Sequence, residues 1–149
     1  MNYWLMKTEP DDFSIDDLAA RKIEPWSGVR NYMARNHMRA MKKGDGVFFY
    51  HSSCAEPGVV GIAVISKEAH PDPTQFDPKS DYFDAKSKRE EPRWSMVEVK
   101  YKKKFKRNIT LTELKTKKEL HDFVLLHPGN RLSVIPVTKK QWDFIVSLA

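Results

Sequence analysis

The sequence has a single cysteine, Cys54, so it cannot form an internal disulfide, and a reducing compartment is indicated. No apolar run approaches the ~20 residues needed to span a membrane, so no membrane partner is expected. The first residues, MNYWLMKTEPDD, lack the basic and apolar segments of a secretory signal. We therefore expect a cytoplasmic protein, or a nuclear one if the source is eukaryotic.

Motifs for common catalytic, metal and cofactor chemistry are also absent. The chain has no glycine-rich phosphate loop and no dinucleotide-binding fingerprint. His51 and Cys54 have the spacing of half a metal site, but no second cysteine and no nearby histidine pair completes it. We expect no cofactor, no metal and no enzymatic activity. The best catalytic alternative is that Lys7, Thr8 and Glu9 supply a base and a nucleophile.

Positive charge is plentiful but unevenly distributed. The net charge is +6 over 149 residues. Residues 21–50 have seven basic residues against two acidic ones, and residues 100–149 have twelve against four. This pattern favours an anionic partner, nucleic acid before membrane, although a merely solvated basic face would look the same. The length fits one domain over residues 1–149, which we expect to be a monomer.

Hydrophobic periodicity predicts an α+β fold, with a small mixed sheet or partial barrel flanked by short helices. Strands are expected over residues 3–7, 47–52, 59–66, 95–101 and 132–137, and helices over 14–20, 30–41 and 117–126. Thr110 with Glu113 and Thr138 with Gln141 resemble capping boxes that begin two more helices. Residues 70–93 contain four prolines and many charges, so we expect a long surface loop with a functional or mobile character.

Two tryptophans and several polar residues lie where predicted strands end. Trp26 and Trp94 lie at junctions between loops and regular elements, where an indole either caps the core or forms a flat wall for a base. Residues 7–9, 28–31 and 51–52 add donors and acceptors that could read the edge of a base. Ordinary structural roles are the alternative: Glu9 could pair with a nearby cation, and Asn31 could cap a helix.

Residues 100–107 (KYKKKFKR) place six basic residues around two aromatic ones. This pattern suits phosphate contacts with bases stacked between them. Two alternatives remain open, because Tyr101 and Phe105 could face the core, and lysines also protect an exposed sheet edge from aggregation.

Six segments of the sequence, taken together, resemble an EVE domain. These segments are WLMKTEP (4–10), WSGVRNYMARNHMRAMKKGD (26–45), FFYHSSCAEPGVVGIAVI (48–65), PDPTQFDP (71–78), RWSMVEVK (93–100) and RLSVIPVT (131–138). The resemblance covers essentially the whole chain. It implies a PUA-like fold, a curved mixed sheet or partial barrel, related to the YTH domains that read methylated adenine in RNA through an aromatic cage.

The resemblance implies a nucleic-acid-binding module that flips a modified base into an aromatic pocket. The base is expected to be 5-methylcytosine or 5-hydroxymethylcytosine, and the polymer DNA rather than RNA. The pocket residues would be Trp4, Lys7, Thr8, Glu9, Trp26, Gly28, Val29, Arg30, Asn31, His51, Ser52, Trp94, Arg131, Leu132 and Ser133. Contacts to the nucleic-acid backbone are expected from Arg35, Arg39, Lys42, Lys43, Lys102, Lys103, Lys104, Lys106 and Arg107.

Two alternatives to a DNA reader remain open at this point. One is a reader of modified tRNA or rRNA, as other PUA-like domains bind RNA. The other is a hydrolase of modified nucleosides related to ASCH domains, which would use Lys7, Thr8 and Glu9.

Overall fold

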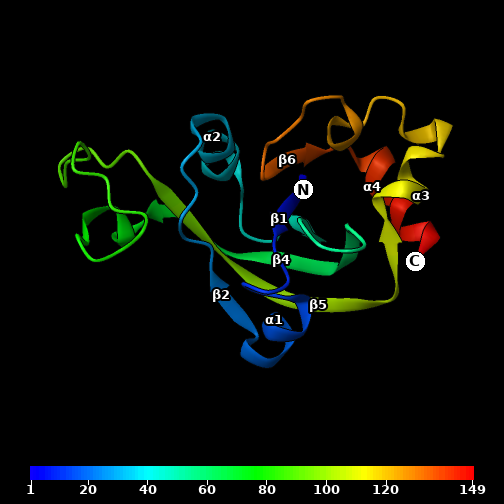
Figure 1. The fold of residues 1–149 in the computed structure, drawn as a ribbon, viewed down its shortest axis with the longest axis horizontal. Coiled ribbons are helices and arrows are strands. Elements are labelled where there is room, and N and C mark those ends of the chain that lie inside the picture. The colour runs from blue at the N-terminus through cyan, green and yellow to red at the C-terminus, as the bar shows by residue number, and fades with distance from the viewer.

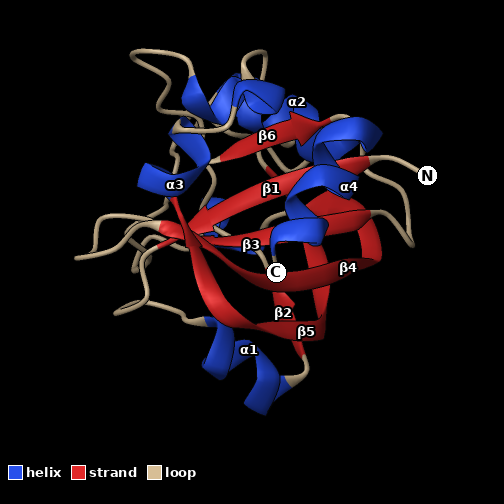
Figure 2. Cartoon of the chain, turned by 90° about the vertical axis from the view of Figure 1, so that its right-hand side faces the viewer, coloured by secondary structure: helices blue, strands red, loops and turns tan.

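A computed structural model describes all residues, 1–149, and shows one six-stranded mixed sheet with four short helices. The elements in chain order are β1 (Tyr3–Thr8), α1 (Ile15–Arg21), β2 (Ile23–Pro25), α2 (Tyr32–Ala40), β3 (Gly46–His51), β4 (Gly58–Pro71), the 3-10 turn η1 (Pro73–Phe76), β5 (Ser95–Thr110), α3 (Leu111–Lys115), the 3-10 turns η2 (Lys118–Leu120) and η3 (Val124–Leu126), β6 (Val134–Val137) and α4 (Lys139–Leu148). The strand order is β2-β5-β4-β3-β1-β6, and the curved sheet is not closed into a barrel (Figures 1 and 2).

Strand β1 pairs in parallel with β3, whereas every other neighbouring pair is antiparallel. In parallel strands the carboxyl ends lie at the same edge, so Thr8 at the end of β1 faces His51 at the end of β3. Residues that follow these two strands are therefore brought together. The pairing of β1 with β6 adds residues 131–133, which precede β6, to the same rim.

Two apolar clusters cover the two faces of the sheet. Along β1, Trp4 and Met6 belong to one cluster and Leu5 to the other, as expected when alternate side chains of a strand point to opposite faces. Helices α1 and α2 cover the first face through residues such as Leu18 and Met38. Helices α3 and α4, with the two 3-10 turns before β6, cover the second.

The structure corrects several predicted elements. Residues 117–126 form two short 3-10 turns, η2 and η3, and not one helix. Strand β5 continues to Thr110, far beyond the predicted end, and the three-residue strand β2 was not predicted. Thr110 caps α3 as expected, but Glu113 does not complete the capping box, because its carboxylate binds Arg107.

The basic run lies within β5 along an outer edge of the sheet. Strand β2 pairs only with residues 98–100, so residues 102–107 have strand β4 on one side and no strand on the other. Phe105 is buried in the cluster under α3 and α4, and Tyr101 packs against the cluster under α1 and α2. This corrects the idea that these rings stack with bases. This arrangement matches the protected-edge alternative.

None of the helices has the length and hydrophobicity needed to cross a bilayer.

A buried carboxylate anchors the start of the sheet. Asp45 accepts hydrogen bonds from the indole nitrogen of Trp4 (3.0 Å) and from the backbone N–H groups of Asn2 (3.1 Å) and Lys42 (2.9 Å).

We predict that Asp45→Ala lowers the free energy of unfolding by about 2–4 kcal/mol, because three donors lose their acceptor. Urea denaturation measures this change. The matched control Asp143→Ala removes an exposed carboxylate and should cost less than about 1 kcal/mol; similar losses in both variants would contradict the role of Asp45.

Candidate functional site

The main cavity of the protein, about 550 Å³, lies at the rim where β1, β3 and the segment before β6 end. Most of the predicted pocket residues line it: Lys7, Thr8, Glu9, Trp26, Gly28, Val29, Arg30, Ser52, Arg131 and Ser133. Backbone hydrogen bonds hold these segments together, from Ser52 N–H to the Thr8 carbonyl (2.9 Å) and from Lys7 N–H to the Ser133 carbonyl (2.8 Å).

Three predicted pocket residues instead hold the fold next to the cavity. Trp4 is 6% exposed and donates its indole N–H to Asp45. Asn31 caps α2, its side chain accepting from Ala34 N–H at 3.0 Å, as the structural alternative supposed. The His51 ring accepts the backbone N–H of Ile15 through Nε2 at 3.1 Å, which fixes the start of α1.

Trp94 and Leu132 also lie outside the cavity lining. The Trp94 ring is stacked on Tyr32 with centroids 4.8 Å apart, and its indole N–H donates to Asp84 at 2.8 Å. Leu132 packs against the core cluster under α3 and α4. Trp94 and Leu132, which were both expected in the pocket, are therefore not part of the cavity lining.

Two aromatic residues that line the cavity were not predicted from the sequence. Phe13 follows β1 and packs against the core, with its ring centroid 6.3 Å from that of Phe49. Tyr82 comes from the long loop of residues 72–94 and is 47% exposed. The only sequence signal for Tyr82 was an aromatic residue within a polar loop. Its ring lies so close to Gly28 that a Cβ there would be 2.8 Å from it.

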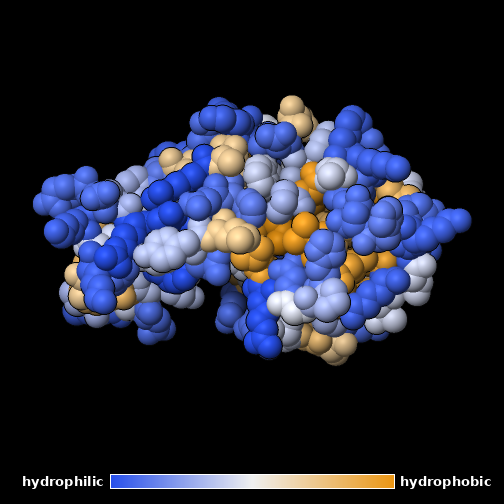
Figure 3. Space-filling view, turned by 90° about the horizontal axis from the view of Figure 1, so that it is seen from above, coloured by the Kyte–Doolittle hydropathy of each residue, from blue (hydrophilic) through white to orange (hydrophobic).

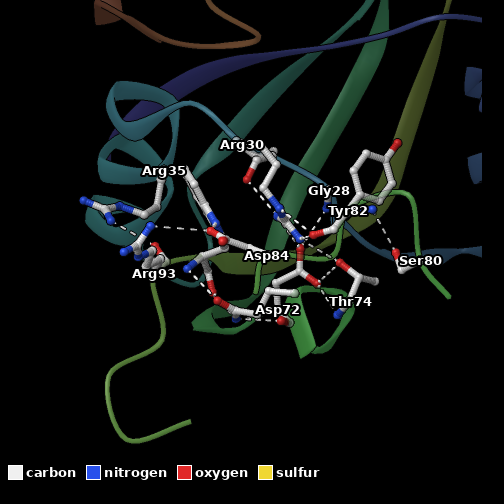
Figure 4. Close-up of polar contacts among 12 residues, drawn as sticks. Gly28, Arg30, Arg35, Asp72, Thr74, Ser80, Tyr82, Asp84 and Arg93 are labelled. Atoms are coloured by element: carbon white, nitrogen blue, oxygen red, sulfur yellow. Dashed lines mark hydrogen bonds and ion pairs between the residues drawn. The ribbon is translucent and has the colours of Figure 1, made fainter. Parts of the chain in front are cut away.

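A buried carboxylate fixes this loop to the cavity rim (Figure 4). Asp72 is fully buried and accepts hydrogen bonds from Gly28 N–H (2.8 Å), Arg30 Nη1 (3.1 Å), and both the backbone N–H and the hydroxyl of Thr74. Arg30 also donates to the Tyr82 carbonyl from two nitrogens, at 2.8 and 3.0 Å. Asp72 and Arg30 thus set the position of Tyr82 across from the strand ends.

Burial and hydrogen bonding oppose each other at Asp72. Burial alone would raise the pKa of this carboxyl, but the hydrogen bonds from Thr74, Gly28 and Arg30 outweigh it and leave the pKa below its ordinary value. The carboxylate is therefore the stable form, as the Arg30 ion pair requires.

Lys7 is the cation at the end of β1 in the cavity. Burial lowers the pKa of its ammonium group, which lies 5.9 Å from the centroid of the Tyr50 ring. Burial, followed by the nearby Cys54, raises the pKa of Tyr50 to about 12, so its phenol stays neutral. Together with Glu9 and Ser52, Lys7 gives the cavity both donors and acceptors beside the aromatic surfaces of Trp26, Phe13 and Tyr82.

A comparison with known protein families matches residues 2–148 to the EVE domain. The chain belongs to the EVE domain family. This EVE domain is similar to thymocyte nuclear protein 1 of Mus musculus, with 47% identity over 99% of this chain and 73% of that protein. A crystal structure of a Pseudomonas putida protein is 51% identical, covers 98% of each chain and superposes with a TM-score of 0.96.

A further solved structure similar to this EVE domain contains nucleic acid. Human THYN1 was crystallised in complex with DNA that contains 5-methylcytosine. It is 43% identical to this chain, covers 99% of this chain and 97% of its own, and has a TM-score of 0.93. The likeness extends over the whole α+β fold.

We predict that Asp72→Ala destabilises the EVE domain by about 3 kcal/mol, because it leaves the largely buried Arg30 without its counter-ion. Urea denaturation measures the loss, and hydrogen exchange should show faster exchange for amides of residues 72–94. Asp77→Ala, in the same loop but exposed, is the control and should change little. Unchanged exchange in the Asp72 variant would contradict its anchoring role.

Acid should weaken the fold through His51. Burial holds the pKa of His51 below its ordinary value of 6.5, so below that pH protons bind the unfolded chain more readily than the folded one. The free energy of unfolding is therefore largest above about pH 6.5 and falls as the pH drops toward the folded pKa. Burial also lowers the pKa of His37, which adds to the trend.

His51→Gln keeps an acceptor for Ile15 N–H but does not titrate, so it should reduce this loss between pH 7 and 5. Denaturation curves at a series of pH values test this, with the exposed His127→Gln as control. An identical pH dependence in the wild type and the His51 variant would show that His51 does not contribute.

Proposed function

We propose that residues 1–149 act as one EVE domain that reads a modified cytosine in DNA by holding the flipped-out base in the main cavity. The observation that carries this proposal is a cavity of about 550 Å³ that combines aromatic surfaces with polar groups. This volume is within the ~300–1,000 Å³ of small-molecule sites. The DNA complex of human THYN1, a relative that shares the whole fold, supports the same partner class.

Base flipping costs a few kcal/mol, because the base leaves its stack and its pairing partner. Stacking on an aromatic side chain returns about 1–3 kcal/mol per base. Trp26 is only 9% exposed and is packed edge-on against Phe49, so it offers a small part of its ring. Tyr82, which is 47% exposed, is the better stacking surface, and Asp72 and Arg30 hold it in place before the base arrives.

The polar residues of the cavity are suited to reading the edge of the base. The ammonium group of Lys7 donates to a carbonyl or ring nitrogen, whereas the carboxylate of Glu9 accepts from an exocyclic amino group. Ser52 and Ser133 can act as both donor and acceptor. A methyl group adds only about 0.8 kcal/mol by burial, so we expect about fourfold discrimination of 5-methylcytosine from cytosine by this term.

The test is a binding titration with matched oligonucleotides that contain cytosine, 5-methylcytosine, 5-hydroxymethylcytosine or N6-methyladenine, each as DNA and as RNA. We expect the tightest binding for a modified cytosine in DNA. Equal and salt-sensitive binding to all would contradict base reading, and preference for the RNA form would favour the RNA reader instead.

Lys7, Thr8 and Glu9 lie together in the cavity, which also fits the hydrolase alternative. We infer a binding module, and a separate experiment tests the hydrolase alternative. Turnover of free modified nucleosides that is lost in Lys7→Ala would establish an ASCH-type hydrolase and overturn the reader.

Replacing Tyr82 by alanine should remove the stacking contribution and weaken binding to the preferred oligonucleotide about 5- to 150-fold. Because the expected preference is itself only about fourfold, binding to the unmodified oligonucleotide should fall by a factor at most about four times smaller, so the preference shrinks. Phe83→Ala is the matched control, because Phe83 is the adjacent residue, is 42% exposed and does not line the cavity. Equal losses in both variants would show that Tyr82 is not a wall of the binding site. Trp26→Ala is less informative, because removing a core ring costs stability as well.

A further inference from the structure

A second hollow, separate from the main cavity, lies between α2 and the end of loop 72–94. We call it the basic hollow. It is about 520 Å³ in volume and has no apolar side chain in its lining apart from Pro92. The residues that line it are Arg35, Arg39, Lys86, Lys88, Glu91, Pro92 and Arg93. Five cations face one carboxylate here, and the surface of the loop is largely hydrophilic (left of Figure 3).

The gathering of these cations is unfavourable in the free protein. Arg35 and Arg39 are four residues apart on α2, so they lie on the same side of the helix and repel each other. Burial, and next the charge of Arg39, lowers the pKa of Arg35. Neither arginine has an ion-pair partner. An arrangement that costs stability in the absence of an anion is typical of a site that binds one.

Backbone carbonyls orient the two arginines. Arg35 donates from Nη1 to the Arg93 carbonyl at 2.9 Å. Arg39 donates from Nη2 to the carbonyls of Pro92 and Arg93, both at 3.2 Å, and from Nε to the Ser95 hydroxyl at 3.0 Å. Neutral acceptors fix the side chains without cancelling their charge. The positive charge thus remains available to an anionic ligand.

A stack of alternating arginines and aromatic rings joins the basic hollow to the main cavity. The Arg35 guanidinium lies over Tyr32 (4.7 Å) and Trp94 (5.9 Å), and that of Arg30 lies over Trp94 (5.4 Å) and Tyr82 (5.6 Å). Arg35 lines the hollow at one end, and Tyr82 lines the cavity at the other. Figure 4 shows Arg35, Arg30 and Tyr82 from left to right along this path. The two sites therefore have a fixed spacing.

We propose that the basic hollow binds phosphate groups of the same nucleic-acid strand whose flipped base occupies the main cavity. The pairing of the two sites rests on the proposed function of the cavity. Phosphate binding in the hollow does not, because it would contribute to binding of any sequence. The hollow also differs from the basic run on β5, where Lys104 and Arg107 are paired with Asp16 and Glu113.

The test is the salt dependence of DNA binding by the double variant Lys86→Ala/Lys88→Ala, measured with cytosine and 5-methylcytosine oligonucleotides. Both lysines are exposed and neither side chain makes a hydrogen bond or ion pair that holds the loop. The matched control is Lys115→Ala/Lys118→Ala, which removes the same charge from α3 and η2, on the other side of the molecule (Figure 1).

We expect the hollow variant to bind both oligonucleotides more weakly by the same factor. The slope of log K against log salt concentration should become shallower by about 2, and the control slope should stay that of the wild type. An unchanged slope in the hollow variant, or an equal change in the control, would overturn the proposal.

The two proposals fail separately in this experiment. If the wild type shows no preference for 5-methylcytosine over cytosine, base reading is contradicted. The change in the slope of log K against log salt concentration alone decides the phosphate site.

A further pair of variants removes a negative charge instead of positive ones. Glu91→Gln should strengthen binding to both oligonucleotides, and Glu90→Gln, next to the hollow but outside its lining, should not; no gain in the Glu91 variant would count against the hollow.

Discussion

The buried carboxylate of Asp72 connects the parts of the molecule on which recognition depends. Asp72 follows β4, yet it binds the backbone of Gly28 and the side chain of Arg30, more than forty positions earlier in the chain. A charge this deeply buried is stable only when it is paired and hydrogen-bonded, so its partners have little freedom to move. The same interaction places Tyr82 at the cavity and the rest of the loop beside α2.

The cavity and the basic hollow divide the two tasks of a nucleic-acid reader. Aromatic and polar groups in the cavity are suited to one base. The cations of the hollow, of which only Arg93 has an ion-pair partner, are suited to phosphates that carry no sequence information. The arginine–aromatic stack between them keeps the distance constant. Affinity and selectivity should therefore depend on different side chains.

Much of this could be predicted from the sequence where the signal was local. The apolar residues 3–7 and the alternation along residues 95–101 predicted two strands of the sheet, and the Thr138 cap predicted the last helix. The clustering of polar residues at strand ends predicted most of the cavity lining. The failures have a common cause, since Tyr82, Phe13 and the stacking of Trp94 on Tyr32 depend on contacts between distant segments. In the basic run, the direction of Tyr101 and Phe105 could not be read from the sequence, because it depends on how β5 pairs. The phosphate contacts expected from this run stay a prediction.

The most direct test of the central claim is a crystal structure of this protein with a DNA duplex that contains one 5-methylcytosine. The account predicts the modified base outside the helix, in the main cavity and against Tyr82, with neighbouring phosphates of the same strand at Arg35, Arg39 and Lys86. A modified base still stacked within the duplex, with the main cavity facing away from the DNA, would contradict it.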